Sequence, residues 1–248
     1  MTDLNFRLPR TVRPQRYALT IDVDLDDWQF RGRETIDLSL GEATAEITLH
    51  AAELEIAAVR AVLPDGTALD GSVALNPVAE TATLRFSKPL AAGSARIHLD
   101  FSGAILARLR GFYRSQKDGA RYAATQFEAA DARRAFPCFD EPEFKARFAL
   151  TLTIPANLTA VANGTVARER DLGGGRKEVV FAETPLISSY LVAYTVGPYE
   201  ATPIATTRGG TPVRVFLPSG MAAKGLYGRD AHVRALEYLE EYTAIPYP

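Results

Sequence analysis

The sequence has little of what metal sites and disulfides require. It contains one cysteine, Cys138, and three histidines, His50, His98 and His232. One cysteine excludes an intrachain disulfide, and one cysteine with three scattered histidines makes no tetrahedral zinc cluster. His232 lies in a helical pattern, but Leu236 stands four residues later and the H-E-x-x-H motif is absent. We therefore predict no metal ligands and no cofactor in this chain, and we expect His50 and His98, which lie in strand patterns, to be structural.

Neither an excess of charge nor a long hydrophobic run is present. Twenty-eight basic residues stand against thirty acidic ones, for a net charge of -2. This balance gives no electrostatic reason to expect nucleic acid or an anionic membrane as a partner. No apolar run approaches the roughly 20 residues of a membrane span, and Met1–Asn5 lack the basic and apolar regions of a signal peptide. We expect a cytoplasmic protein that binds neither nucleic acid nor membranes.

Motifs for nucleophilic or phosphate chemistry are equally scarce. The sequence has no G-x-S-x-G elbow and no phosphate-binding loop, and Gly173–Gly175 is typical of a hairpin tip. Cys138 has apolar neighbours, which favours a buried and inert thiol. The basic stretch Arg108, Arg110 and Arg114 is compatible with phosphate binding, but a solvated strand edge accounts for it better.

Alternating apolar residues run through most of the chain, and hydrophobic residues make up 47% of it. A period of two predicts half-buried strands, and turn residues at spacings near ten predict an antiparallel, mainly β architecture. Asn163-Gly164 is interpreted as a tight hairpin turn because both residues tolerate positive φ. The alternation includes Tyr17, Leu19, Ile21, Val23, Ile36, Leu38, Leu40, Ile97, Leu99, Phe101, Phe148, Leu150, Leu152 and Ile154.

The C-terminal part of the sequence has a different pattern. Val213–Leu217 predicts one short strand, and Lys224–Tyr242 has apolar positions on one broad helical face. We therefore predict a large β domain at 1–203 and a strand and a helix at 204–248 that begin another unit. The chain resembles an interrupted fold, and we expect the apolar face of the helix either to fold back or to stay exposed.

The densest group of ionisable residues lies between Thr125 and Pro142. If the chain is a strand from Thr125 to Glu128, Gln126 and Glu128 point to one face and Phe127 to the other. An amide and a carboxylate would then be presented together for binding. The alternative, favoured by physical chemistry alone, is a salt-bridge network in which Glu128 or Asp131 pairs with Arg133 or Arg134.

The same segment, from Thr125-Gln126-Phe127-Glu128-Ala129 through Asp131-Ala132-Arg133-Arg134-Ala135-Phe136-Pro137-Cys138-Phe139-Asp140-Glu141-Pro142, closely resembles the signature of aminopeptidase N-type zinc metallopeptidases. This gluzincin aminopeptidase family includes puromycin-sensitive aminopeptidase and leukotriene hydrolase. Weaker similarities lie on both sides, at Leu8-Pro9, at Pro14-Gln15-Arg16-Tyr17 and at 186–197. The resemblance therefore spans essentially the whole chain.

The resemblance implies a saddle-like, antiparallel, multi-sheet N-terminal domain through about residue 203. It implies that 204–248 begin a thermolysin-like catalytic domain. The family's G-A-M-E-N motif, zinc-binding H-E-x-x-H helix and further glutamate are not in this sequence. We therefore expect zinc only in the full-length protein, with this chain inactive alone and dependent on the remaining catalytic and C-terminal domains.

The resemblance also implies roles for two residues. Gln126 would line the pocket for the first side chain of a peptide, and Glu128 would help to hold the free amino group of the peptide N-terminus. Asp131, Arg133 and Arg134 remain structural in this interpretation. The competing hypothesis is a non-catalytic β scaffold or interaction module derived from the same family, which would not need an amine anchor.

Overall fold

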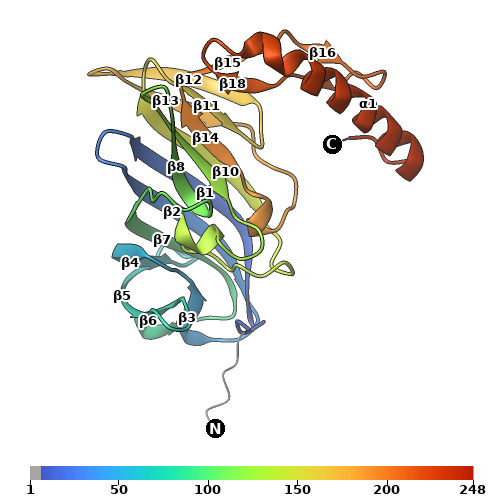
Figure 1. Cartoon of the computed structure of the whole chain (residues 1–248). Coiled ribbons are helices and arrows are strands. Elements are labelled where there is room, and N and C mark those ends of the chain that lie inside the picture. The colour runs from blue at the N-terminus through green and yellow to red at the C-terminus, as the bar shows by residue number, and fades with distance from the viewer. Residues whose placement is uncertain (1–6, 248) are drawn as a thin grey trace.

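The computed structural model describes residues 7–247, so Met1–Asn5, on which the signal-peptide expectation rests, lie outside the described residues. The predicted mainly β fold is confirmed, with several antiparallel sheets and a C-terminal helix (Figure 1). The elements are β1 (Val12–Asp24), β2 (Gln29–Leu40), β3 (Thr44–His50), β4 (Leu54–Val62), β5 (Ala68–Asn76), β6 (Thr81–Leu90), β7 (Gly93–Ala104), β8 (Gly111–Lys117), β9 (Ala120–Gln126), η1 (Ala132–Arg134), β10 (Arg147–Pro155), β11 (Thr159–Ala162), β12 (Val166–Gly173), β13 (Arg176–Phe181), η2 (Ser189–Leu191), β14 (Tyr194–Gly197), β15 (Tyr199–Ala201), β16 (Ala205–Thr206), β17 (Pro212–Val213), β18 (Phe216–Pro218), η3 (Ala222–Gly225) and α1 (Leu226–Thr243).

A ten-stranded sheet forms the larger layer, with the strand order β12-β13-β10-β1-β2-β7-β4-β5-β6-β3. Its central strands alternate as the sequence predicts. In β1, Tyr17, Leu19, Ile21 and Val23 are at most 2% exposed, while the residues between them are partly or fully exposed. One face of the sheet is therefore packed and the other faces solvent.

One pair of neighbouring strands departs from the antiparallel expectation. β1 and β10 run parallel, with Tyr17 opposite Phe148, and the rings of these two residues stack at 4.7 Å between centroids. A parallel pair needs a long connection between its strands. Here that connection contains the rest of the sheet's central strands and the hairpin of β8 and β9. Alternation within a strand does not specify the direction of its neighbour, which explains the difference.

A four-stranded sheet, in the order β11-β14-β9-β8, packs on the inner face of the larger one. Aromatic rings connect the layers. Phe30 of β2 meets Phe112 of β8 at 5.5 Å, and Phe112 meets Tyr194 of β14 at 4.9 Å. Phe127, which follows β9, contacts both Phe136 and Tyr194 edge-on. The core between the two sheets therefore reaches directly under the segment that carries Gln126 and Glu128.

The interpretation of Asn163-Gly164 as a hairpin turn is wrong. These residues connect β11, in the smaller sheet, to β12, in the larger one, and neither has positive φ. The Asn163 side chain donates to the Leu191 carbonyl at 2.8 Å and accepts from the Ala193 N–H at 2.7 Å. A Cβ on Gly164 would lie 2.2 Å from the Ala182 carbonyl oxygen. Glycine is needed here for a close approach of two backbones rather than for positive φ.

The C-terminal segment lies to one side of the sheets, with α1 projecting from them (Figure 1). The predicted helix is confirmed as α1, Leu226–Thr243, preceded by η3. The single strand predicted at Val213–Leu217 is divided into β17 and β18. β18 pairs with β15 and β17 pairs with β16. The first of these pairs crosses the predicted domain boundary at residue 203, so the two segments are joined by backbone hydrogen bonds; the boundary itself stays a prediction.

Candidate functional site

Gln126 is the last residue of β9, and the two neighbouring strands fix its position. On one side β8 pairs with β9 and places Gly111 opposite Gln126. On the other side β14 pairs with Ala123 and Ala124. The predicted alternation is confirmed, since Gln126 and Glu128 are exposed and Phe127 is 2% exposed between them. The strand ends earlier than expected, however, so Glu128 lies in a turn.

This turn, defined here as Phe127–Asp131, is closed by a hydrogen bond within it. The Asp131 N–H donates to the Phe127 carbonyl at 2.9 Å, and the short helix η1 follows directly. Phe127 anchors the start of the turn because its ring is held between Phe136 and Tyr194 in the core. The buried ring and the closing hydrogen bond therefore set where the Glu128 carboxylate emerges.

Arg133 and Arg134 form the predicted salt-bridge network, but they form it without Glu128. Arg134 binds Asp131 at 2.7 Å through Nε, Glu53 at 2.8 Å through Nη1, and Glu80 through Nη2. Arg133 binds Asp140 at 3.0 Å and Glu80 at 3.2 Å, and Arg108 binds Glu53. The Asp131–Arg134 pair that the structural alternative named is confirmed. Among residues 7–247, Glu128 has no ion pair and no side-chain hydrogen bond.

The charges in this network do not cancel. Three guanidinium groups, Arg108, Arg133 and Arg134, meet the four carboxylates of Glu53, Glu80, Asp131 and Asp140. Glu128 adds a further negative charge three residues before Asp131. Burial of the two central arginine side chains, 12% and 11% exposed, limits screening by solvent. The region around the turn therefore favours a cation, and Glu128 is the carboxylate free to receive one.

Glu53 and Glu80 were missed by the sequence analysis as members of this network. They lie in the loops after β3 and before β6, far from η1 along the chain. Both have left-handed backbones, with φ of 59° and 53°. Non-glycine residues adopt this region rarely, mostly in turns. No local pattern in the sequence pairs either residue with Arg134, because the contact is created when the sheets pack.

His50 and Asp140 form a buried polar contact behind the network. The Asp140 N–H donates to His50 Nδ1 at 3.2 Å, and the Asp140 carboxylate accepts from the Ser189 hydroxyl at 2.6 Å. Burial, followed by the positive charge of Arg133, lowers the pKa of His50 to about 4. The imidazole is therefore neutral at pH 7, as an acceptor at Nδ1 requires. The expected structural role of His50 is confirmed.

The remaining predicted structural residues also occupy well-defined places. Cys138 is fully buried, as predicted, and burial raises the pKa of its thiol. Arg108 pairs with Glu53, while the guanidinium group of Arg114 lies 5.5 Å from the ring centroid of Trp28. His98 Nδ1 and the Thr35 hydroxyl form a hydrogen bond of 2.9 Å between two paired strands.

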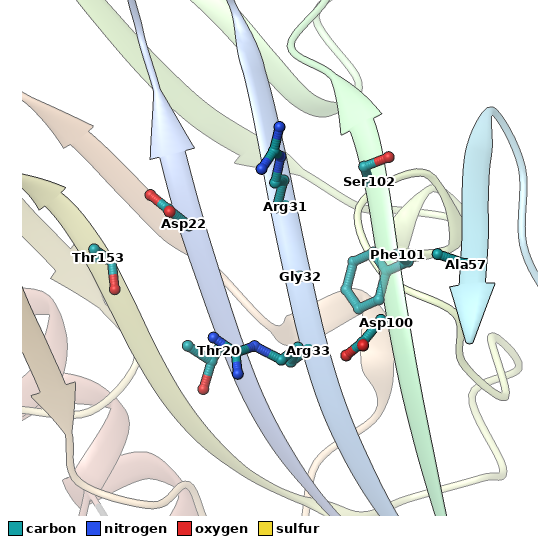
Figure 2. A pocket seen from close by; sticks show the side chains of 10 residues that line it. All are labelled: Thr20, Asp22, Arg31, Gly32, Arg33, Ala57, Asp100, Phe101, Ser102 and Thr153. Carbon is teal, nitrogen blue, oxygen red and sulfur yellow. The ribbon is translucent and has the colours of Figure 1, made fainter. Parts of the chain in front are cut away.

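A hollow of about 500 Å³ lies elsewhere, on the solvent face of the large sheet (Figure 2). It includes neither Gln126 nor Glu128. Opposite charges face one another across its strands, with Asp22 opposite Arg31 and Arg33 opposite Asp100. Such cross-strand pairs are typical of an exposed sheet surface. Its lining residues are Thr20, Asp22, Arg31, Gly32, Arg33, Ala57, Asp100, Phe101, Ser102 and Thr153.

Metal ligands do not come together in the part of the chain that the structure describes. Within residues 7–247, no three side chains of His, Cys, Asp or Glu form a group that could hold a metal ion. The residues present therefore do not fit a zinc ion. None of the helices in the same range combines the length and the apolar character needed to cross a bilayer.

Comparison with known proteins agrees with the fold and with the signature around the turn. Residues 13–191 match the family described as the Peptidase M1 N-terminal domain. This match covers more than half of the chain, so the chain belongs to that family. Its mainly β architecture and the Thr125–Pro142 segment are thus those of a peptidase N-terminal domain.

Three relatives place the chain among aminopeptidases. It is 36% identical over 247 residues to aminopeptidase N of Acetobacter pasteurianus, covering 98% of this chain and 68% of that protein. It is 38% identical over 250 residues to aminopeptidase M1-A of Oryza sativa subsp. japonica, and 37% identical over 250 residues to puromycin-sensitive aminopeptidase of Caenorhabditis elegans. Both alignments include 98% of this chain, but they include only 28% and 26% of the two relatives.

Proposed function

We propose that this chain is the N-terminal part of a zinc-dependent aminopeptidase that removes N-terminal amino acids from peptides. Glu128 receives the free amino group of the peptide, and Gln126 beside it lines the pocket for the first side chain. The observation that carries this proposal is the exposed carboxylate of Glu128, which has no ionic partner within residues 7–247. The two arginines that could have neutralised it bind other carboxylates.

The chemical requirement is recognition of one ammonium group. An aminopeptidase must distinguish a free N-terminus from an internal peptide bond, and the ammonium charge is the difference between them. A charge-assisted hydrogen bond from that group to a carboxylate is roughly twice as strong as a neutral one. The surplus of carboxylates around the turn strengthens the attraction, and Gln126 offers an amide that can donate and accept.

We propose zinc as a cofactor of the complete protein and not of this chain. The described residues do not fit a metal ion, so residues outside this sequence would hold it. The peptide cleft would likewise be completed by further domains, which are the proposed partners of this chain. A cytoplasmic location is part of the same proposal.

The test is Glu128→Ala in the complete protein. Losing one partner of a buried charge pair costs about 2–5 kcal/mol, which corresponds to roughly a thirtyfold to several-thousandfold fall in kcat/KM. We expect that fall with zinc content and melting temperature nearly unchanged. If Glu128 were structural, the melting temperature would fall and kcat/KM would be spared.

Two controls sharpen the test. Glu143→Ala removes a carboxylate from the same part of the chain, where it pairs with Arg10 at 2.9 Å on the surface, and should leave kcat/KM unchanged. An N-acetylated peptide lacks the ammonium group. The wild type should strongly prefer the free peptide over the acetylated one, and Glu128→Ala should lose most of that preference.

A further inference from the structure

We propose that Arg134 and Asp131 are positioning residues for Glu128, holding its turn in place without touching the peptide. This inference rests on the proposed function of Glu128 and extends it. The contacts form a continuous path from the loops of the large sheet to the turn. Each step of the path is a hydrogen bond, an ion pair or a close packing contact between named residues.

The first step joins Arg134 to Asp131 and, through Asp131, to Phe127, the two ends of the turn. Its Nε donates to the Asp131 carboxylate at 2.7 Å, and the Asp131 N–H donates to the Phe127 carbonyl at 2.9 Å. Arg134 also packs against β8, because a Cβ on Gly111 would lie 2.9 Å from its own Cβ. Gly111 is the strand partner of Gln126. The same arginine therefore packs against the strand partner of Gln126 and binds Asp131, the last residue of the turn that carries Glu128.

The second step fixes Arg134 to the rest of the molecule. Its Nη1 and Nη2 bind Glu53 and Glu80, which come from two different loops. A backbone hydrogen bond from the Ala51 N–H to the Glu80 carbonyl joins the two loops, and another from the Ala52 N–H to the Arg133 carbonyl joins the first loop to η1, both at 2.9 Å. Arg134 is thus bound to three carboxylates, and it links the turn to two loops of the large sheet.

The geometry of the guanidinium group explains why arginine stands here. Three of its nitrogens each reach a different carboxylate, on Asp131, Glu53 and Glu80. A lysine ammonium at the end of a flexible stem is a point charge and cannot reproduce a planar fork. Arg134→Lys should therefore keep the charge of the cluster but loosen the turn.

The left-handed backbones of Glu53 and Glu80 support a positioning role. Residues in such sparsely populated conformations persist where the surrounding contacts over-determine them, and they cluster at functional sites. Here both carboxylates that secure Arg134 come from such residues. Glu128 itself takes no part in the network, so the network can set the position of this carboxylate without neutralising it.

Asp131→Asn tests the inference most directly, because it weakens the link to the turn and leaves Arg134 bound to Glu53 and Glu80. In the complete aminopeptidase we expect kcat/KM to fall about tenfold or more. In a Glu128→Ala background the same substitution should have almost no further effect, since no anchor is left to position. Residues that act through one another are non-additive in this way, whereas independent effects add.

Hydrogen exchange provides a second readout on the 248-residue chain, independent of catalysis. Arg134→Lys should lower the protection of the Asp131 amide against exchange. Asp131→Asn should lower the protection of the amide at the same position after correction for its different intrinsic exchange rate, with β1 and β2 unchanged in both variants. Asp37→Asn is the matched control, because it weakens a surface pair with Arg96 at 2.7 Å in the large sheet. It should change neither the exchange of the Asp131 amide nor kcat/KM.

The outcomes separate this inference from the proposed function. If Glu128→Ala leaves kcat/KM unchanged, the amine-anchor role fails, and the positioning role fails with it. Suppose instead that Glu128→Ala strongly lowers kcat/KM. If Asp131→Asn then leaves kcat/KM unchanged, or lowers it equally in both backgrounds, only the positioning role is overturned. Loss of kcat/KM in the wild-type background alone, together with lower protection of the amide at position 131, supports the positioning role. The same loss with unchanged protection in both variants overturns it.

Discussion

Glu34 places a carboxyl group inside the hydrophobic core. It lies in the middle of β2, 3% exposed, opposite Leu19 of β1 and Leu99 of β7. Neither of its carboxyl oxygens has a hydrogen-bond partner among residues 7–247. Burial raises the pKa of Glu34 well above its ordinary value of 4.5, because the charged form is poorly solvated there. The folded protein therefore holds Glu34 in its neutral form to higher pH than the unfolded chain does.

This raised pKa predicts a stability that falls as pH rises. Above pH 4.5 the unfolded chain loses the proton that the folded state keeps, so ionisation favours unfolding. Glu34→Gln has no proton to lose. Relative to the wild type it should gain stability as the pH rises above 4.5, by at most about 1.4 kcal/mol per pH unit.

Urea unfolding at a series of pH values measures this difference directly. Comparing wild type and variant at each pH cancels other titrations, including that of His50, whose lowered pKa acts in the opposite direction as pH falls. Glu55→Gln, at an exposed position in β4, is the matched control for replacing a carboxylate by an amide. A Glu34→Gln difference that does not vary with pH would contradict the prediction.

At the scale of elements, the helix α1 is only sparsely covered by the rest of the molecule. None of its residues is buried, and Tyr238, Leu239 and Tyr242 are 64%, 51% and 76% exposed. The rings of the two tyrosines stack at 6.0 Å. Polar contacts such as that from the Arg208 N–H to Glu237, at 2.7 Å, tie the helix to the small β16–β17 sheet. The sequence left two alternatives open for the apolar face, folding back on the β domain or staying exposed, and the structure shows the second.

We predict that α1 exchanges its amide hydrogens faster than the central strands, and that its apolar face promotes self-association. Exposed apolar patches commonly mark interaction surfaces. Hydrogen exchange and sedimentation at rising protein concentration measure the two effects. Slow exchange throughout α1 in a protein that stays monomeric at high concentration would refute this prediction.

A pair of variants identifies the surface. Leu239→Glu should reduce self-association because it introduces a charge at the centre of the exposed face. Val78→Glu is the control, since Val78 is 93% exposed but lies in the loop between β5 and β6, away from α1. It should leave the sedimentation behaviour unchanged.

At the scale of the whole molecule, we predict that the 248-residue chain binds no stoichiometric zinc and cleaves no aminoacyl substrate. The sequence has no H-E-x-x-H, and residues 7–247 offer no group of metal ligands. Elemental analysis of the purified chain and turnover of a leucyl or alanyl reporter amide are the measurements. Stoichiometric zinc together with turnover would show that the chain carries a site of its own.

At the residue scale, the exposure pattern of the segment that carries Gln126 and Glu128 was predictable from the sequence. The alternation around Phe127 correctly placed Gln126 and Glu128 on the exposed side, since a buried aromatic between two polar residues specifies the face. The buried position of Glu34 could also have been found, because the alternation of Ile36 and Leu38, continued two residues back, reaches it. Those inferences need only the period of one strand.

The sequence by itself determined the central strands, the terminal helix and the family, because periodicity and a continuous motif are local properties of the chain. The tertiary structure decided which groups meet. Arg134 finds Glu53 at a separation of 81 residues and Glu80 at 54, and β1 finds β10 as a parallel neighbour. Such contacts arise only when whole sheets pack, because a charge or a strand edge carries no local record of its partner. That packing left Glu128 without an ionic partner among residues 7–247, which the sequence alone could not specify.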